Sequence, residues 1–342
     1  MIPETPAKCQ SLSTTETLSW QSELQTIITD PGELWKILEL PTELLPQAYE
    51  AHALFPLKAP RPFIARMQKG DINDPLLRQV LPLGIETETH VGFSADPLQE
   101  QNAVNPHPGL LHKYQGRVLL IATGICAINC RYCFRRQFPY EANNPGRSGW
   151  KQSLDYIAAD ASIHEVILSG GDPLMSSDQM LAWFMQELSA IAHVKIIRIH
   201  TRLPIVIPQR VTSSLLEALT TTRLNTVMVL HSNHAQEIDS AVAQAANDLK
   251  SAGIMLLNQS VLLKGINDNA QALMELSYRL FDCGVIPYYL HQCDRVNGSA
   301  HFEVGDNTAL VLHQTLKDNL AGYLVPRLVR EISGEASKIW LN

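Results

Sequence analysis

Three cysteines lie close together in the chain at a spacing that could bring their sulfur atoms around one centre. They are Cys126, Cys130 and Cys133, and Tyr132 directly precedes the third. Thiolates at this spacing are soft ligands that suit iron and sulfide, and three of them can hold three corners of a four-iron, four-sulfur (4Fe–4S) cluster. A structural zinc site is the alternative, but it ordinarily takes four protein ligands in two pairs, and the sequence has no second pair. The spacing therefore favours an iron–sulfur cluster with one iron left open.

From Leu111 onward the chain alternates short β-branched or aliphatic runs with longer amphipathic stretches, a pattern typical of repeated βα units. Right-handed crossovers would wind such units into one parallel sheet. An open doubly wound sheet and a partial or full barrel both fit this alternation. The predicted strands are 118–122, 165–168, 195–200, 226–231, 254–259 and 285–291, and the predicted helices are 150–159, 177–192, 213–221, 235–252 and 270–283.

The predicted strands end in polar or glycine-containing segments, which include the cysteine loop after the first strand. In α/β sheets and barrels the functional groups gather at the carboxyl ends of the strands. Sequence therefore predicts a site at this edge. The segments are 126–133, Ser169-Gly170-Gly171-Asp172, His200-Thr201-Arg202, His231, Asn258-Gln259 and His291-Gln292-Cys293-Asp294.

The first part of the chain has a different character, with helical spacing in 15–40 and prolines at positions 41, 46, 56, 60 and 62. Prolines at this density interrupt regular elements. We therefore predict two parts, a helical N-terminal region over 1–105 and a core over 106–342.

Composition limits the class of protein. In 342 residues, 45% are hydrophobic and 18% are charged, as in globular proteins. The formal net charge of −7 argues against nucleic acid as a partner, because phosphate binding needs a basic face. Apolar runs are shorter than the roughly 18 residues of a membrane span, and no basic-then-apolar leader is seen at the N-terminus. We therefore expect a cytoplasmic protein without membrane contact.

The cysteine spacing and its aromatic residue resemble the signature of the radical S-adenosylmethionine (SAM) superfamily. The resemblance implies a partial (β/α)6 TIM-like barrel with a helical N-terminal region, in which the open iron of a 4Fe–4S cluster binds the amino and carboxylate groups of SAM. Ser169, Gly170, Gly171 and Asp172 resemble the superfamily's glycine-rich motif beside SAM.

Further segments, from about residue 96 to the C-terminus, resemble the lysine 2,3-aminomutase family, and within it the branch that serves elongation factor P. The resemblance implies a pyridoxal 5'-phosphate (PLP) cofactor on Lys338, which follows the turn Ser333-Gly334-Glu335-Ala336-Ser337. It implies further PLP and SAM contacts at Lys113, Tyr114, Arg117, His231 and Gln259. Arg135 would hold the carboxylate of L-lysine, and Asp294 and Glu331 would hold its far ammonium.

The implied reaction converts L-α-lysine to β-lysine, in the R form by analogy with that branch, for modification of elongation factor P by a lysyl ligase. It requires an external electron donor. Glu331 departs from the aspartate that the lysine-degrading aminomutases carry at this position. The sequence leaves other functions open: a radical SAM methyltransferase or activase without PLP, a non-catalytic iron–sulfur protein, or a zinc-binding scaffold. A bound PLP absorbance band or SAM cleavage would distinguish them.

Overall fold

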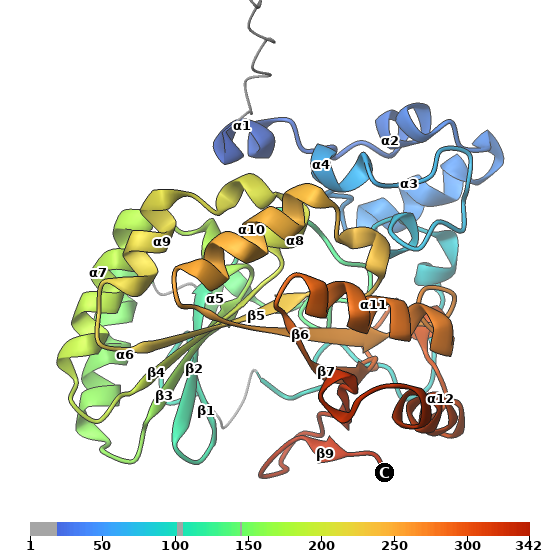
Figure 1. Cartoon of the computed structure of the whole chain (residues 1–342). Coiled ribbons are helices and arrows are strands. Elements are labelled where there is room, and N and C mark those ends of the chain that lie inside the picture. The colour runs from blue at the N-terminus through green and yellow to red at the C-terminus, as the bar shows by residue number, and fades with distance from the viewer. Residues whose placement is uncertain (1–18, 101–104, 144–145) are drawn as a thin grey trace, which may run out of the picture.

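The computed structural model describes residues 19–100, 105–143 and 146–342 and arranges them around one strongly curved sheet (Figure 1). Within these residues the sheet has nine strands in the order β1 to β9. Strands β2 to β8 run parallel, whereas β1 and β9 pair antiparallel at the two ends of the sheet. The strands are β1 Leu110–Tyr114, β2 Arg117–Thr123, β3 Glu165–Gly170, β4 Ile196–Thr201, β5 Asn225–His231, β6 Met255–Leu262, β7 Ile286–Gln292, β8 Arg327–Arg330 and β9 Ile339–Trp340.

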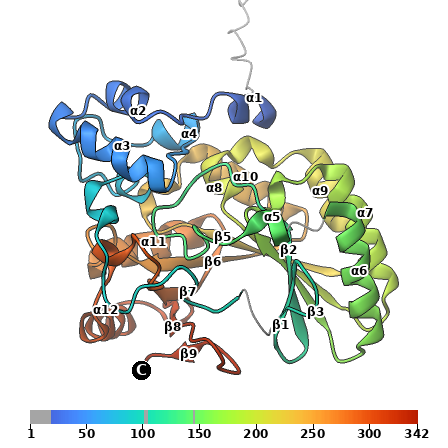
Figure 2. The ribbon, with the colours of Figure 1, turned by 180° about the vertical axis from the view of Figure 1, so that it is seen from behind.

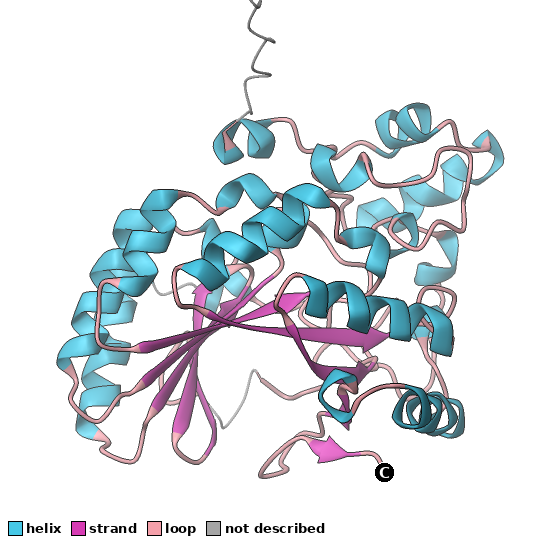
Figure 3. Cartoon of the chain, viewed as in Figure 1, coloured by secondary structure: helices cyan, strands magenta, loops and turns pink. Residues whose placement is uncertain are grey.

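Helices cover the outer face of the curved sheet (Figure 3). Most of the longer ones begin at a side chain that caps the helix by accepting a backbone N–H, as Ser177, Thr212, Asp239 and Asn269 do. The α-helices are α1 Trp20–Gln25, α2 Pro31–Leu38, α3 Leu45–Leu54, α4 Arg61–Ile64, α5 Tyr140–Asn143, α6 Gly146–Ala159, α7 Asp178–Ala190, α8 Leu203–Val206, α9 Ser213–Thr220, α10 Ser240–Ser251, α11 Ala270–Asp282 and α12 Asp306–Asn319.

The two faces of the sheet have different environments. Along β6, alternate residues from Leu256 to Leu262 are buried beneath the helices, whereas Leu257, Gln259 and Val261 keep some accessible surface. Because side chains alternate between the faces of a strand, the second set points to the concave side. This inner face carries Gln259, whereas its predicted strand-end neighbour Asn258 lies on the face beneath the helices.

The predicted α/β architecture with a partial barrel is confirmed. Each of the six predicted strands coincides with one of β2 to β7 within a few residues. The sheet order is linear in the described part of the chain, so the barrel is open rather than closed. The sequence analysis missed the strands β1, β8 and β9, because they are short and because β1 and β9 pair antiparallel, outside the βα pattern. It also missed the helix α12.

The described part of the N-terminal region, residues 19–100, consists of α1 to α4, short 3-10 turns and irregular segments. It lies above the sheet in Figure 2, next to the segments that follow the carboxyl ends of β2, β4, β5 and β6. Arg66 of this region donates to the carbonyl oxygens of Ile205 and Glu237, which follow β4 and β5. Residues 1–18 and 101–104, which belong to the same predicted region, lie outside the described residues. No helix in the described ranges has the length and hydropathy to cross a bilayer.

Candidate active site

The cysteine loop directly follows β2 and is held in place by the N-terminal region. The backbone N–H of Asn129 donates to the Lys58 carbonyl at 2.9 Å, and that of Arg131 donates to the Gln79 carbonyl at 2.9 Å. The Arg131 side chain is fully buried and donates to both oxygens of the Glu86 carboxylate, at 2.6 to 3.1 Å. A buried bidentate pair of this kind fixes orientation as well as position. The N-terminal region therefore determines the shape of the loop.

The three thiols are close enough to influence one another. Burial raises the pKa of the Cys126 thiol, and charges on Asp172, Cys133 and Cys130 raise it further. Burial and the Cys130 charge raise the pKa of Cys133 to about 11. Since a metal ligand must be a thiolate, these thiols would bind metal with release of protons.

The donor set, three thiols in one loop, suits a cluster with three cysteine ligands. In the described ranges, no three Cys, His, Asp or Glu side chains are grouped so that they could hold one metal ion. A cubane cluster needs no such convergence, because each cysteine binds a different iron. Three thiols that influence one another in one loop therefore suit the three cysteine-bound irons of a 4Fe–4S cluster.

The glycine motif packs the end of β3 against the start of the cysteine loop. A Cβ atom on Gly171 would lie 2.6 Å from the Ile125 carbonyl oxygen, and one on Gly170 would lie 2.9 Å from that of Thr123. Gly170 also has a φ of +108°, which disfavours any side chain. Both glycines are thus required by the close approach of the end of β3 to residues 123–125, directly before Cys126.

The Asp172 carboxylate is engaged within the fold. It accepts hydrogen bonds from the Thr201 hydroxyl at 2.6 Å and from the backbone N–H groups of Leu174, Arg202 and Leu203 at 2.8 to 3.0 Å. Its contacts join the end of β3 to the end of β4. Ser169, at the start of the motif, instead accepts a hydrogen bond from Arg135 Nη1 at 3.1 Å.

A series of ion pairs connects Arg135 with Lys338. Arg135 donates to Glu100 through Nε at 2.6 Å and Nη2 at 3.0 Å, and Lys113 Nζ lies 3.1 Å from the same carboxylate. Lys113 also lies 3.4 Å from Glu331, whose other oxygen is 2.5 Å from Lys338 Nζ. The series therefore runs from a position two residues after Cys133 to the far end of the chain.

The remaining predicted residues lie beside this series. Tyr114 donates to Glu331 at 3.1 Å, and the Arg117 guanidinium lies 4.6 Å from the centre of the Tyr114 ring. Asp294 shows no ion pair in the described structure, but Glu331 and Lys338 both influence its pKa. The structure thus gathers the predicted PLP and substrate residues in one region.

The two acidic residues of this region have opposite pKa shifts. For Glu331, burial opposes ionisation, but the charges of Lys338 and Lys113 outweigh burial and lower the pKa to about 2. For Asp294, burial and then the Glu331 charge raise the pKa to about 7. When two carboxyl groups share a region of low dielectric constant, their pKa values commonly move apart, because the charge on one disfavours ionisation of the other. At neutral pH the first is ionised and the second is partly protonated.

Histidines line the inner face of the sheet. His231 Nε2 lies 2.7 Å from Gln259 Nε2, and these two residues are neighbours across β5 and β6. Burial lowers the pKa of His200, His231 and His291, and the Lys338 charge contributes to each shift. The Nε2 atoms of His200 and His291 are buried without a hydrogen-bond partner in the described structure. Unpaired buried polar atoms are unfavourable, so these suit a region that receives a polar ligand such as PLP or SAM.

Sequence analysis noted His200, Arg202 and His291 only as strand-end groups, and it missed Glu100. Arg202 donates to Cys130 Sγ at 2.8 Å. Glu100 lies before the predicted core, where no strand or motif marked it. Its role depends on tertiary contacts to Arg135 and Lys113, which no local pattern reveals.

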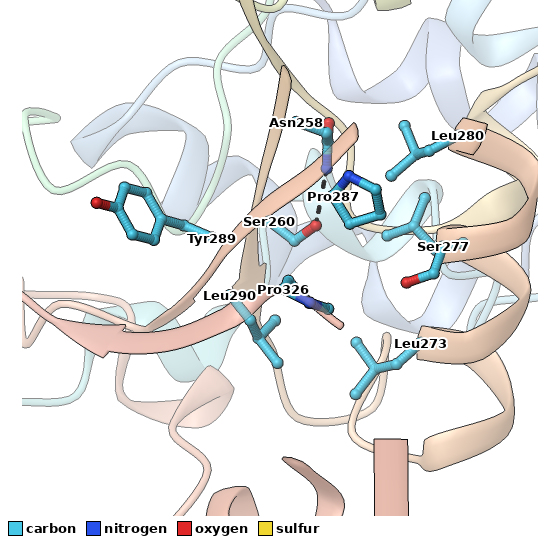
Figure 4. Close-up of a pocket in the computed structure, with 10 residues that line it drawn as sticks. Asn258, Ser260, Leu273, Ser277, Leu280, Pro287, Tyr289, Leu290 and Pro326 are labelled. Atoms are coloured by element: carbon cyan, nitrogen blue, oxygen red, sulfur yellow. Dashed lines mark hydrogen bonds between the residues drawn. The ribbon is translucent and has the colours of Figure 1, made fainter. Parts of the chain in front are cut away.

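A small cavity lies between β6, β7 and α11 (Figure 4). Its volume is about 10 Å³, and its lining includes Leu273, Leu276 and Leu290. Tyr289 borders it but projects away from it, and the Lys338 ammonium lies 5.8 Å from the centre of that ring. The cavity is a packing gap in the core, since it has room for about one water molecule.

Comparison with known proteins identifies relatives over almost the whole chain. The model of the radical SAM superfamily matches residues 120–276. The L-lysine 2,3-aminomutase of Haemophilus influenzae is 50% identical over 323 residues, which cover 94% of this chain and 95% of that protein. That of Escherichia coli is 50% identical over 97% of both chains, and that of Clostridium subterminale is 36% identical over 81% of this chain and 66% of its own.

Proposed function

This chain belongs to the L-lysine 2,3-aminomutase family within the radical SAM superfamily, and we propose that it is an isomerase that converts L-α-lysine to (R)-β-lysine. The proposal includes a 4Fe–4S cluster on Cys126, Cys130 and Cys133. One-electron cleavage of SAM at this cluster would supply the means to remove a hydrogen atom from an unreactive carbon. PLP on Lys338 would supply the π-overlap that lowers the barrier to moving nitrogen between neighbouring carbons.

Arg135 is proposed to hold the carboxylate of the substrate. Glu100 already binds Nε and Nη2 of this guanidinium, and Ser169 accepts from Nη1. The outer edge of the fork, between Nη1 and Nη2, remains suited to a second carboxylate. Glu100 and a substrate can therefore bind Arg135 together.

Glu331 and Asp294 are proposed to hold the far ammonium of lysine. In the structure, the Lys338 ammonium already contacts Glu331 as a substrate ammonium would. Any molecule that engages the Lys338 nitrogen frees Glu331 to bind a different ammonium. A cation beside Asp294 would also favour its ionised form. The two ends of the site thus select a substrate of fixed length.

Lys113, Arg117 and Tyr114 are proposed to hold the phosphate and ring of PLP. Cations suit a phosphate, and Lys113 lies within 3.4 Å of Glu331, close to the Lys338 amine that PLP would occupy. Ser169, Gly170, Gly171, Asp172, His231 and Gln259 are proposed to border SAM, with Asp172 acting through the loop that it anchors. The imidazoles stay neutral because burial lowers their pKa, so they add no positive charge beside the SAM sulfonium.

The proposed product is a building block for modification of elongation factor P by its lysyl ligase. The proposed setting is the cytoplasm, where cysteines remain reduced and available to a cluster. An external one-electron donor completes the system.

The continuous series of ion pairs from Arg135 to Lys338 carries this proposal, because it brings the predicted PLP lysine into one region with the cysteine loop. The test uses the anaerobically reconstituted and reduced protein with SAM, PLP and L-lysine. Chiral separation of the lysine isomers should give (R)-β-lysine. Reductive SAM cleavage without any β-lysine would refute the proposal and favour another radical SAM reaction.

A further inference from the structure

We propose that Arg202 tunes the reduction of the cluster through its contact with Cys130, an inference that rests on the cluster assigned under the proposed function. The side chain is 6% exposed and donates from Nη1 to Cys130 Sγ at 2.8 Å. Hydrogen bonds and charges at cluster sulfurs are known determinants of reduction potential. Arg202 acts through a cluster ligand, so it is a positioning residue and not a catalytic one.

The guanidinium is fixed by groups from three distant segments. Its Nη1 also donates to the Tyr132 hydroxyl at 2.8 Å, and its Nη2 donates to Gln79 at 2.5 Å and to Glu237 at 2.9 Å. Asn233 joins Gln79 and Tyr132 by two further hydrogen bonds, at 2.9 and 2.6 Å. Such a connected buried network leaves the guanidinium little freedom to move away from the sulfur.

The backbone of Arg202 is fixed as well. Asp172 accepts its N–H at 2.8 Å, and the N–H of Asp172 donates to the carbonyl of Ile125, next to Cys126. Asp172 therefore connects the residue before Cys126, through its backbone N–H, with the backbone of Arg202, through its carboxylate. This arrangement keeps the charge of Arg202 at a set place relative to Cys130.

Arg202 is distinguished from the other cations near the thiols by direct contact. Lys58 influences Cys126 and Arg136 influences Cys133 through their charges, and Arg135 influences Cys133 through its charge and a backbone hydrogen bond. Among these four cationic side chains, that of Arg202 donates to a thiol sulfur in the described structure. A fixed positive charge at a sulfur stabilises the more negative, reduced cluster. In the step concerned, a low-potential flavin or iron–sulfur protein loses one electron and the cluster passes from the 2+ to the 1+ state. No bond of Arg202 is made or broken.

The test is an anaerobic redox titration of the reconstituted full-length protein, without SAM, PLP or lysine, followed by electron paramagnetic resonance of the reduced cluster. Arg202→Gln removes the charge, and we expect its cluster to be at least tenfold harder to reduce, equivalent to a midpoint about 59 mV more negative. Arg202→Lys keeps the charge and should shift less than half as far. An Arg202→Gln protein with full iron content and the wild-type midpoint would overturn the inference.

Arg210→Gln is the matched control, because Arg210 is also fully buried but binds the Leu174 and Ser176 carbonyls and Asp178. It should lower stability without moving the midpoint. An equal shift in this variant would also overturn the inference, since it would indicate a general effect of unfolding.

Glu237→Gln decides the matter if Arg202→Gln cannot hold a cluster. It removes a negative charge beside Arg202 and leaves the guanidinium in the chain, so the midpoint should become less negative. A midpoint that is unchanged or more negative would refute the inference. Lysine and PLP are absent from these measurements, so the inference and the proposed function can fail separately. If the wild-type protein produces β-lysine but the Arg202 variants keep the wild-type midpoint, the inference fails and the proposed function stands.

Discussion

Glu100 binds the Nε and Nη2 atoms of Arg135 at 2.6 and 3.0 Å, and both side chains are almost fully buried. This contact joins the N-terminal region to the loop that follows Cys133. It also explains why Arg135 keeps its charge, since burial lowers its pKa but the Glu100 charge outweighs burial and raises it. The carboxylate therefore orients the group that we propose for substrate binding.

Replacing Glu100 by glutamine should weaken the binding of lysine. The substitution removes the charge from two hydrogen bonds to Arg135, and such bonds are worth about 1.5–3 kcal/mol each in proteins. We expect the KM for lysine to rise by roughly tenfold to a hundredfold, with a smaller change in kcat, as measured by steady-state kinetics. A fall in KM would contradict this view and indicate that Glu100 competes with the substrate. Glu165→Gln is the control, because Glu165 pairs with Arg198 at the start of β3 and β4.

Lys338→Arg should abolish covalent attachment of PLP while it retains a positive charge beside Glu331. An amine can form a reducible bond with the PLP aldehyde, whereas a guanidinium cannot do so readily. Borohydride reduction followed by peptide mapping should place the label on Lys338 in the wild-type protein and remove it in the variant. Lys317→Arg, in the last turn of α12, should label like the wild type. Label on another lysine of the variant would show that the assignment is wrong.

Cys130→Ser should prevent assembly of the cluster, because the hydroxyl is a poor ligand for iron in place of a thiolate. Iron and sulfide content after anaerobic reconstitution should fall from about four of each per chain to near zero. Cys283→Ala is the matched control, since Cys283 is buried in the core after α11 and far in sequence from the loop. A fully loaded Cys130→Ser protein would refute the ligand assignment.

The sequence was most informative where structure is local and periodic. The six strands β2 to β7 alternate with helices, so their positions followed from hydrophobic spacing. The cysteine loop was recognisable because its three cysteines lie within eight positions of the chain. In contrast, Glu100 and Gln79 contact residues more than 30 positions away, and their contribution depends on how the N-terminal region packs against the sheet.

The glycine motif illustrates a different limit. The sequence analysis predicted that Gly170, Gly171 and Asp172 lie beside SAM. In the structure these residues also make contacts that hold the fold together. The glycines permit the approach of β3 to the cysteine loop, and the Asp172 carboxylate binds the backbone N–H groups of Arg202 and Leu203, which follow β4. The motif therefore marks a segment that packs against the cysteine loop, but it does not reveal what each side chain touches.

Asp294→Asn should stabilise the ligand-free protein more at pH 8 than at pH 5. The pKa of Asp294 is raised from 3.8 to about 7 by burial and by Glu331. Between these values the folded protein keeps a proton that the unfolded chain releases, so this residue reduces stability as pH rises through the window. At pH 8 the cost is on the order of a few kcal/mol, at about 1.4 kcal/mol per pKa unit.

Asparagine cannot ionise, so the variant should avoid that cost and melt several degrees higher than the wild type at pH 8, with a smaller gain at pH 5. Differential scanning fluorimetry at both pH values measures this difference. Asp282→Asn, at the exposed end of α11, should give the same small change at both. The same Asp294 variant should lose affinity for lysine, because its amide cannot balance the ammonium. A stability gain that is equal at both pH values would contradict the protonated state assigned to Asp294, whatever happens to lysine binding.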